Sequence, residues 1–215
     1  MTTKKRVCYI NFLKVNFSYN LFFITNMLPL QASTYFCLMN TTEMQHLQYP
    51  IGKFEYGKTY SFDDTKNHIE NLRVFPHDLM KVAAILKAED LDKTYRPDGW
   101  SIKQLIHHIG ESHMNCYIRL KLALTEDSPV IKPYLEDLWV KTEENNLLGP
   151  AVSLTLIEAI HIKLVTLLQT MQEADFNRTY IHPQYNRTFT IAEMLALYSW
   201  HGKHHLAHIN LALGN

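Results

Sequence analysis

The segment Trp200-His201-Gly202-Lys203-His204-His205-Leu206-Ala207-His208 carries four histidines on a stretch that is otherwise typical of a helix. His201 and His205 are four residues apart, so on a helix they lie on the same face, with about 5–6 Å between their Cβ atoms. Two imidazoles at this spacing can bind one divalent metal ion. The pattern therefore predicts a helix that ends in part of a metal site.

The composition is that of an ordinary globular domain. The chain has 215 residues, of which 47% are hydrophobic, and its formal net charge is zero. This length predicts one domain with a full core, and the absence of net charge gives no electrostatic reason to expect a nucleic acid partner. The cysteines Cys8, Cys37 and Cys116 are scattered and odd in number. They predict no disulfide framework and no cysteine metal motif, and they favour a reducing cytoplasm.

Residues 1–45 differ from the rest of the chain. Lys4-Lys5-Arg6 precedes a mostly apolar stretch, which is the order found in a signal peptide. Polar residues interrupt this stretch, so no run approaches the ~18–20 residues that span a bilayer, and we expect no membrane segment. Three interpretations fit: an over-extended gene start with true initiation near Met39 or Met44, a loosely packed tail, or an export signal. We expect residues 46–215 to form the fold.

Apolar residues recur at helical spacing in four long segments. The segments begin at Ser61 or Asp63, at Ser101, at Ala151 and at Thr190, and the third ends near Met171. Pro76 either begins a new helical stretch or kinks a longer one. Ser101 with Gln104, and Thr190 with Glu193, have the spacing of a capping box, in which each side chain bonds the other residue's backbone N–H.

The connections between these segments are mostly irregular. Residues 129–150 predict a long connection with a short helix around Glu136–Lys141, and residues 180–189 predict a short hairpin-like connection. No strand pattern persists elsewhere in the sequence. Four long amphipathic helices therefore predict an all-α fold, a helical bundle.

A helical wheel separates the histidines of the final segment. At about 100° per residue, His201, His205 and His208 share the stripe that points into the core, and His204 lies at its edge, which favours a peripheral position. The alternative is a polar helix end, because the macrodipole favours histidine near a C-terminus. A buried imidazole with neither a hydrogen bond nor a metal is costly, and this favours metal ligands on the stripe.

A second histidine cluster lies about a hundred residues upstream, on the segment that begins at Ser101. His113 points toward the apolar centre of that segment, while His107 and His108 flank the centre on opposite sides. The spacing does not choose the third ligand among them, and His113 is also compatible with a core histidine bonded to a hydroxyl. Three imidazoles with water in the remaining positions are typical of a catalytic site, and imidazole suits zinc or nickel.

Several separated motifs occur in a familiar order. They are Tyr95-Arg96-Pro97-Asp98-Gly99-Trp100-Ser101-Ile102-Lys103-Gln104-Leu105-Ile106-His107-His108-Ile109, Glu111-Ser112-His113-Met114-Asn115, Tyr117-Ile118-Arg119 and the final histidine run. This series resembles the DinB-like superfamily, and within it the YfiT-type metal-dependent hydrolases. The resemblance covers roughly Tyr49 to Leu213. Residues 1 to about 45 have no counterpart in it, which favours the over-extended start.

The resemblance implies a four-helix bundle with an up-down-down-up order and a metal site at one end. Carried over by position, the ligands are His108, His201 and His205, which bind one divalent metal ion per subunit, zinc or nickel, with water completing the shell. His208 is then expected beside the ligands. The family also implies a cytoplasmic homodimer that acts on a small-molecule substrate. The chain departs from the family pattern at Glu111, where an aspartate is usual, and at Leu135 and Gly202-Lys203.

Three functions are compatible with such a site. The first is a metal-dependent hydrolase, in which metal-bound water attacks an amide or ester bond of a small molecule, with Glu111 as a candidate acid or base. The second is a metal-dependent S-transferase for a low-molecular-weight thiol such as bacillithiol or mycothiol. Asn115 and Arg119 are candidate pocket residues, and in the transferase they would bind the acid or sugar groups of the thiol. The third is a non-enzymatic, metal-binding helical dimer.

Overall fold

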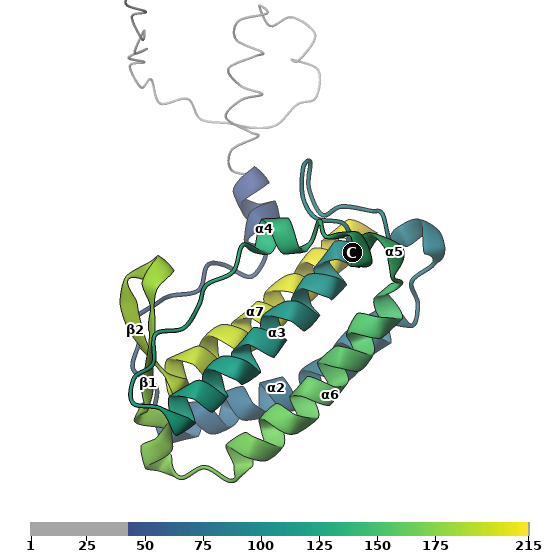
Figure 1. Cartoon of the computed structure of the whole chain (residues 1–215). Coiled ribbons are helices and arrows are strands. Elements are labelled where there is room, and N and C mark those ends of the chain that lie inside the picture. Colours follow the sequence, from purple (N-terminus) through teal and green to yellow (C-terminus); the bar gives the residue numbers. More distant parts are fainter. Residues whose placement is uncertain (1–42, 215) are drawn as a thin grey trace, which may run out of the picture. The chain divides into compact units, whose positions relative to one another are not determined.

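Four long helices make up most of the part of the chain that this computed structural model describes, residues 43–214. They are α2 (Phe62–Ala83), α3 (Ile102–Thr125), α6 (Pro150–Gln169) and α7 (Ile191–Leu213). The helices run side by side (Figure 1), and the predicted all-α bundle is confirmed. The expected extension, residues 1–45, lies almost wholly outside the described residues, so its three interpretations stay predictions.

Local hydrogen bonds explain where these helices begin. The Ser61 hydroxyl accepts from the Asp64 amide and the Asp64 carboxylate accepts from the Ser61 amide, so a capping box begins α2. Ser101 and Gln104 do the same for α3, as predicted. Pro76 lies buried inside α2, which continues past it to Ala83.

The predicted capping box at the start of α7 forms only in part. The Thr190 hydroxyl accepts from the Glu193 amide at 3.1 Å. The Glu193 carboxylate does not bond back to Thr190. It accepts instead from the Gly57 amide at 2.7 Å and from Arg187, because a nearly buried carboxylate gains more from a charged partner. Glu193 therefore ties the segment before α2 to the start of α7.

Contacts between side chains give the order of the helices. His107 meets Ser153 and His113 meets His161, so α3 and α6 run parallel. The pairs His108–His201 and Arg119–Tyr198 show that α7 runs antiparallel to α3. α2 packs against both α6 and α7. A parallel α3 and α6 need a long crossover between them, and the chain from 126 to 149 supplies it. The order is the expected up-down-down-up.

The connections carry the remaining structure. The crossover holds α4 (Glu136–Trp139) and α5 (Glu143–Leu147). The described part also has three 3-10 turns, η2 (Ala88–Asp90), η3 (Glu173–Asn177) and η4 (Pro183–Tyr185). The predicted hairpin is confirmed as the antiparallel strands β1 (Thr179–His182) and β2 (Arg187–Thr190), which pair Tyr180 with Phe189. The hairpin lies at the end of the bundle where α7 begins (Figure 1).

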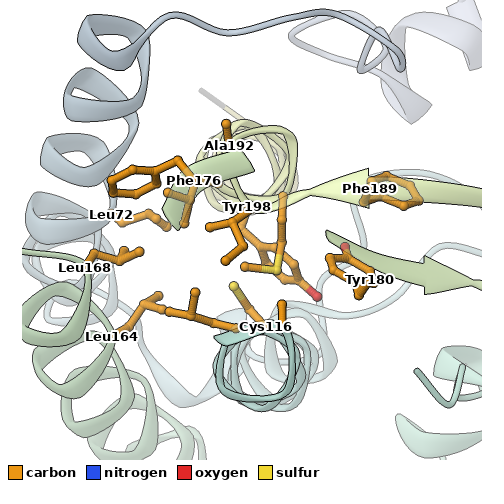
Figure 2. Packing of buried hydrophobic residues seen from close by; sticks show 14 of the residues in the cluster. Leu72, Cys116, Leu164, Leu168, Phe176, Tyr180, Phe189, Ala192 and Tyr198 are labelled. Atoms are coloured by element: carbon orange, nitrogen blue, oxygen red, sulfur yellow. The ribbon is translucent and has the colours of Figure 1, made fainter. Parts of the chain in front are cut away.

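The core continues from the bundle into this hairpin. Tyr180 and Phe189 stack with their ring centroids 5.5 Å apart. Figure 2 shows them beside Cys116 of α3 and Tyr198 of α7, with leucines of α2 and α6 on the other side. Cys116 is free and fully buried in this core. The hairpin therefore closes the core at one end and fixes the position of Tyr180.

One bundle helix is unusually apolar. By length and composition alone, α6 could cross a membrane. It packs against α2 and α3 in the bundle, and the core helices of bundles have the same character. The helix therefore fits the sequence-based expectation of a third bundle helix.

Candidate metal centre

Three imidazoles from two antiparallel helices converge on one point. His108 lies in the first half of α3, His201 at the middle of α7 and His205 one turn later, so the antiparallel packing brings them together. Their ligand nitrogens all lie within 4.8 Å of one another, and the Nε2 atoms of His108 and His201 are 3.1 Å apart. The structure thus assembles the three residues that the family resemblance singled out.

A chain of hydrogen bonds fixes the proton of His201. His161 Nδ1 lies 2.6 Å from the Leu72 carbonyl oxygen, which can only accept, so this nitrogen donates. In a neutral imidazole the other nitrogen then has no proton. His161 Nε2 accepts from His113 Nδ1 at 2.8 Å, and His113 Nε2 accepts from His201 Nδ1 at 3.2 Å. The Nε2 lone pair of His201 is left facing the site.

A second, shorter chain fixes His205 in the same way. His208 Nε2 donates to the Gln48 carbonyl oxygen at 3.3 Å, so His208 Nδ1 accepts. Its donor is His205 Nδ1, also at 3.3 Å. The Nε2 atom of His205 therefore has no proton. Both ligand candidates on α7 are held as the Nδ1–H tautomer by chains that end on backbone carbonyls.

This arrangement fits a divalent cation. Without a metal, a proton on His108 Nε2 can form a hydrogen bond to His201 Nε2 but leaves His205 Nε2 without a partner among the described residues. A cation can accept a lone pair from each of the three imidazoles at once. In a tetrahedral site with metal–nitrogen bonds of about 2.0–2.1 Å, ligand nitrogens lie about 3.3 Å apart, close to the His108–His201 separation. Burial lowers the pKa of His108 to about 4. Burial, followed by the neighbouring histidines, also lowers the pKa of His201 and His205 well below the usual value. The three are neutral at pH 7, the form that binds metal.

The described residues contain one other triad of suitable geometry, His204, His205 and His208. Here the lone pair of His208 Nδ1 already accepts from His205, and its other nitrogen is bonded to the Gln48 carbonyl oxygen. A metal at this triad would have to break one of the two bonds. Hydrogen bonding therefore favours the triad that spans both helices.

The other histidines have distinct positions. His107 Nδ1 bonds the Ser153 hydroxyl at 2.7 Å and faces α6. His113 is a core histidine, but its partners are His161 and His201 rather than a hydroxyl. The expectation that His204 is peripheral is wrong: its side chain is 7% exposed and its ring stacks on Trp200 at 4.3 Å. Trp200 lies one turn before His204 and covers it, which a wheel of one helix cannot show.

Two candidate residues on α3 lie away from the pocket beside the imidazoles. Glu111 Oε1 accepts from the Asn145 amide at 2.9 Å, and burial raises the pKa of Glu111. The Asn115 amide donates to the Glu111 carbonyl oxygen on its own helix. Neither lines the pocket described below, so the roles expected for Glu111 and Asn115 there are not supported. The residue that turns toward the triad is Ser112, whose Oγ lies 3.5 Å from His201 Nε2.

A pocket of about 360 Å³ opens beside the three imidazoles. Its walls are largely aromatic and include Trp100, Trp200 and Tyr198. Arg119 lines it as predicted, and its guanidinium donates to the Tyr198 hydroxyl at 3.1 Å. Among the described lining residues the only carboxylate is that of Glu136. His208 lies behind His205 rather than in the pocket, which agrees with its expected place beside the ligands.

Sequence reasoning missed several residues of this site. No other histidine lies three or four residues from His161, on α6, so the sequence gives no sign that it belongs to the site. Its role follows only from the contact of α6 with α3 and α2. Gln48 contributes its backbone carbonyl oxygen, an atom that every residue has, so its identity gives no clue to this role. His182 and Tyr180 reach the pocket from the hairpin, whose position depends on the tertiary fold.

The fold and the site place the chain among small helical-bundle proteins, with two antiparallel helices that carry three histidines able to hold a metal ion. The chain belongs to the DinB superfamily, whose family model matches residues 71–209. A relative from Bacillus licheniformis is 40% identical over 166 residues, which cover 77% of this chain and 94% of that protein. A relative from Oceanobacillus iheyensis is 43% identical over 75% of this chain and 93% of its own length. Both are provisionally named metal-dependent hydrolases.

Solved structures show the same fold. YfiT from Bacillus subtilis, described as a probable metal-dependent hydrolase with an unusual four-helix bundle topology, matches with a TM-score of 0.75 and 36% identity. The match covers 78% of this chain and 95% of YfiT. A mycothiol-dependent maleylpyruvate isomerase matches with a TM-score of 0.57 and 17% identity over 70% of this chain and 63% of the isomerase. This second likeness concerns the fold alone.

Proposed function

We propose that the protein is a metal-dependent hydrolase that acts on an ester or amide bond of a small molecule. The observation that carries the proposal is the convergence of one ring nitrogen each from His108, His201 and His205 on the wall of an aromatic pocket, with the Nε2 atoms of the two α7 histidines held unprotonated. We propose these residues as the ligands of one divalent ion, zinc or nickel. The pocket volume of about 360 Å³ suits a small substrate.

A divalent metal held by His108, His201 and His205 would lower the pKa of a bound water or thiol and would polarise a carbonyl oxygen. The chain's own residues hold and orient this site. The two hydrogen-bond chains keep the protons of His201 and His205 on the nitrogens that face away from the pocket. Trp100 packs against His108, with ring centroids 4.6 Å apart, and supports the ring of that ligand candidate from one side. Preorganisation of this kind avoids reorienting the ligands during the reaction.

The titratable groups around the pocket restrict which leaving groups the reaction can release. No hydrogen bond joins a carboxylate to the three imidazoles within the described residues, and Glu136, on the pocket wall, is exposed. The pKa of His204 falls to about 3, first through burial, so its imidazolium is scarce at pH 7. An amide needs its leaving amine protonated, whereas an ester with an acidic alcohol does not. The geometry therefore favours ester-type substrates.

The same observation favours a second candidate, the low-molecular-weight thiol S-transferase. A thiol has a reference pKa of about 8.5 and loses its proton far more easily than water. It therefore needs no carboxylate base beside the metal. The described residues around the triad supply none, which suits a thiol nucleophile as well as an ester substrate.

Turnover assays on the purified protein separate the two. One arm measures hydrolysis of nitrophenyl esters and nitroanilides, and the other measures conjugation of a chromogenic electrophile with glutathione, cysteine, bacillithiol and mycothiol. We expect ester hydrolysis that disappears with EDTA and in His201→Ala, and that persists in His77→Ala, a matched change at an exposed histidine of α2.

Each other outcome changes the conclusion. Metal-stimulated conjugation without ester hydrolysis would refute the hydrolase and favour the transferase. Bound metal with turnover in neither arm would favour the non-enzymatic metal-binding protein. Homodimerisation and the cytoplasmic location stay predictions.

A further inference from the structure

Arg119 places a full positive charge deep in the bundle. The side chain lies on α3, is 8% exposed, and lines the pocket that contains the histidine triad. Its hydrogen bond goes to the neutral hydroxyl of Tyr198. No salt bridge joins Arg119 to a carboxylate anywhere in residues 43–214. A buried charge without a counterion is costly, so such a residue normally has a partner.

The groups around Arg119 cannot become that partner. Burial raises the pKa of Tyr198, Tyr180 and Cys116 far above neutrality, and it raises the pKa of Tyr134 to about 12. All four stay protonated and uncharged at pH 7. Glu136, the carboxylate of the same lining, is exposed and forms no salt bridge with Arg119 within residues 43–214. No buried negative charge in this part of the pocket therefore offsets Arg119, because a guanidinium does not lose its proton in proteins.

A second buried group nearby also has no partner. His182, at the end of β1, is 5% exposed and lines the same pocket. Its Nδ1 atom is buried and bonds no atom of the described residues. Burial, and then the charge of Arg119, lowers the pKa of His182 to about 4, so it is neutral at pH 7. It adds a polar nitrogen to the Arg119 end of the pocket but no second charge.

We propose that Arg119 binds a carboxylate of the substrate, so that the protein acts on small carboxylic acids. The planar guanidinium fork matches a carboxylate with two parallel hydrogen bonds. One positive charge balances one negative charge, which favours a carboxylate over a doubly charged phosphate ester. The proposal rests on the proposed function, because it takes this pocket as the substrate site.

The distance from Arg119 to the triad limits the length of the substrate. Tyr198 lies between them: its hydroxyl accepts the Arg119 bond, and its ring centroid is 5.8 Å from that of His201. A carboxylate at Arg119 therefore places a group only a few bonds away beside the imidazoles. The aromatic side chains of the lining favour an unsaturated or aromatic body between the two ends.

Binding of three probes that share a phenyl ring and differ in the attached polar group tests the proposal directly. Benzoate, benzamide and phenylphosphate are titrated into the purified protein, with binding followed by calorimetry and by the fluorescence of the pocket residues Trp100 and Trp200. We expect wild-type protein to bind benzoate at least tenfold more tightly than either other probe. This comparison needs no variant, so it stands even if a substitution at a buried position prevents folding.

Variants then test whether Arg119 supplies the positive charge that binds benzoate. We expect Arg119→Gln to reduce the benzoate preference to less than twofold, and Arg119→Lys to retain part of it. Arg73→Gln, at an exposed arginine of α2, is the matched control and keeps it fully. Equal affinity of the wild type for benzoate and benzamide would overturn the proposal, as would an unchanged preference in a folded Arg119→Gln protein.

Two further measurements separate this proposal from the alternative explanations. If benzoate binds through the metal, its tighter binding relative to benzamide disappears after EDTA treatment. That result would also overturn the role of Arg119. Tighter binding of phenylphosphate than of benzoate would assign the site to phosphate esters instead. A benzoate preference that depends on Arg119, without turnover of any ester or thiol, would leave the subsite in place and refute only the proposed function.

Discussion

The direction of hydrogen bonds at single nitrogen atoms determines which histidines can bind a metal. Leu72 and Gln48 each present a carbonyl oxygen, which can only accept. From these two fixed points the protons of five imidazoles follow, and the Nε2 atoms of His201 and His205 are left bare. Position rather than bond direction excludes His107, whose Nδ1 meets a hydroxyl of α6 and which belongs to neither histidine triad.

Metal content tests the ligand set. We expect about one metal ion per wild-type chain, and less than a tenth of that in His108→Ala or His205→Ala, because each change removes a ligand. His208→Ala keeps the stoichiometry with affinity roughly 10–100-fold weaker, since it removes only the residue that orients His205. Elemental analysis of purified protein provides the measurement. His107→Ala is the neighbouring control, and loss of metal there with retention in His108→Ala would show that the assignment is wrong.

The tautomers can be observed directly. Nitrogen-15 NMR of the imidazole rings is expected to show His161, His113 and His201 as Nδ1–H tautomers, and His208 as Nε2–H. In His161→Gln an amide can still donate to Leu72 and accept from His113, so the His201 signal and the metal affinity stay close to wild type. His161→Leu breaks the chain, and we expect metal affinity to fall roughly 10–100-fold. An Nε2–H signal from His113 in the wild type would contradict the proposed direction of the chain.

At the scale of elements, the site depends on how closely α7 approaches α2. A Cβ atom built on Gly202 would lie 2.9 Å from the ring of Phe75. That ring stacks on His113 and packs against His161, with centroids 5.5 Å apart in both cases. Glycine is therefore required at position 202 by the contact with α2, and the phenylalanine supports the histidine chain from one side.

Gly202→Ala is expected to destabilise the protein by about 1–3 kcal/mol, because the ring of Phe75 cannot move without displacing the two histidines. The free energy of unfolding is measured by urea titration, together with metal affinity, which we expect to fall as well. Gly149→Ala serves as control: Gly149 has open space around it, and a surface change of this kind alters stability by about 0.5 kcal/mol or less. Equal stability of Gly202→Ala and wild type would refute this account of the packing.

At the scale of the whole molecule, buried neutral histidines couple folding to pH. His161 is 2% exposed, and burial lowers its pKa from 6.5 to about 4. Between these two values the unfolded chain binds more protons than the folded chain, so stability is complete above about pH 6.5 and falls as the pH decreases toward 4. Below pH 4 the loss from this residue levels off.

We therefore expect His161 to contribute about 2 kcal/mol less stability at pH 5 than at pH 8. Urea unfolding of EDTA-treated protein at the two pH values measures the difference, and His161→Gln should reduce it by that amount. His77→Gln, at an exposed position of α2, should leave it unchanged. An identical pH dependence in wild type and His161→Gln would exclude His161 as a source of the acid sensitivity.

Much of this molecule could be predicted from residues that act locally. Ser101 and Gln104 begin α3 through bonds within one turn, and the four-residue spacing of His201 and His205 places them on one face of α7 wherever that helix lies. Helical periodicity alone predicted four helices and a bundle. The choice of His108 over its neighbour His107 came from the family resemblance, because both flank the apolar face of α3 at similar angles.

The sequence by itself determined the four helices, their beginnings and the pair of imidazoles on α7, because each depends on contacts within a few residues. Only the tertiary structure decided what surrounds that pair. It turned Glu111 toward Asn145, buried His204 under Trp200, and placed His161 behind His113. Within residues 43–214 it also left the buried Arg119 without a salt bridge. These outcomes depend on which helix packs against which, and local spacing along one helix carries no information about its neighbours.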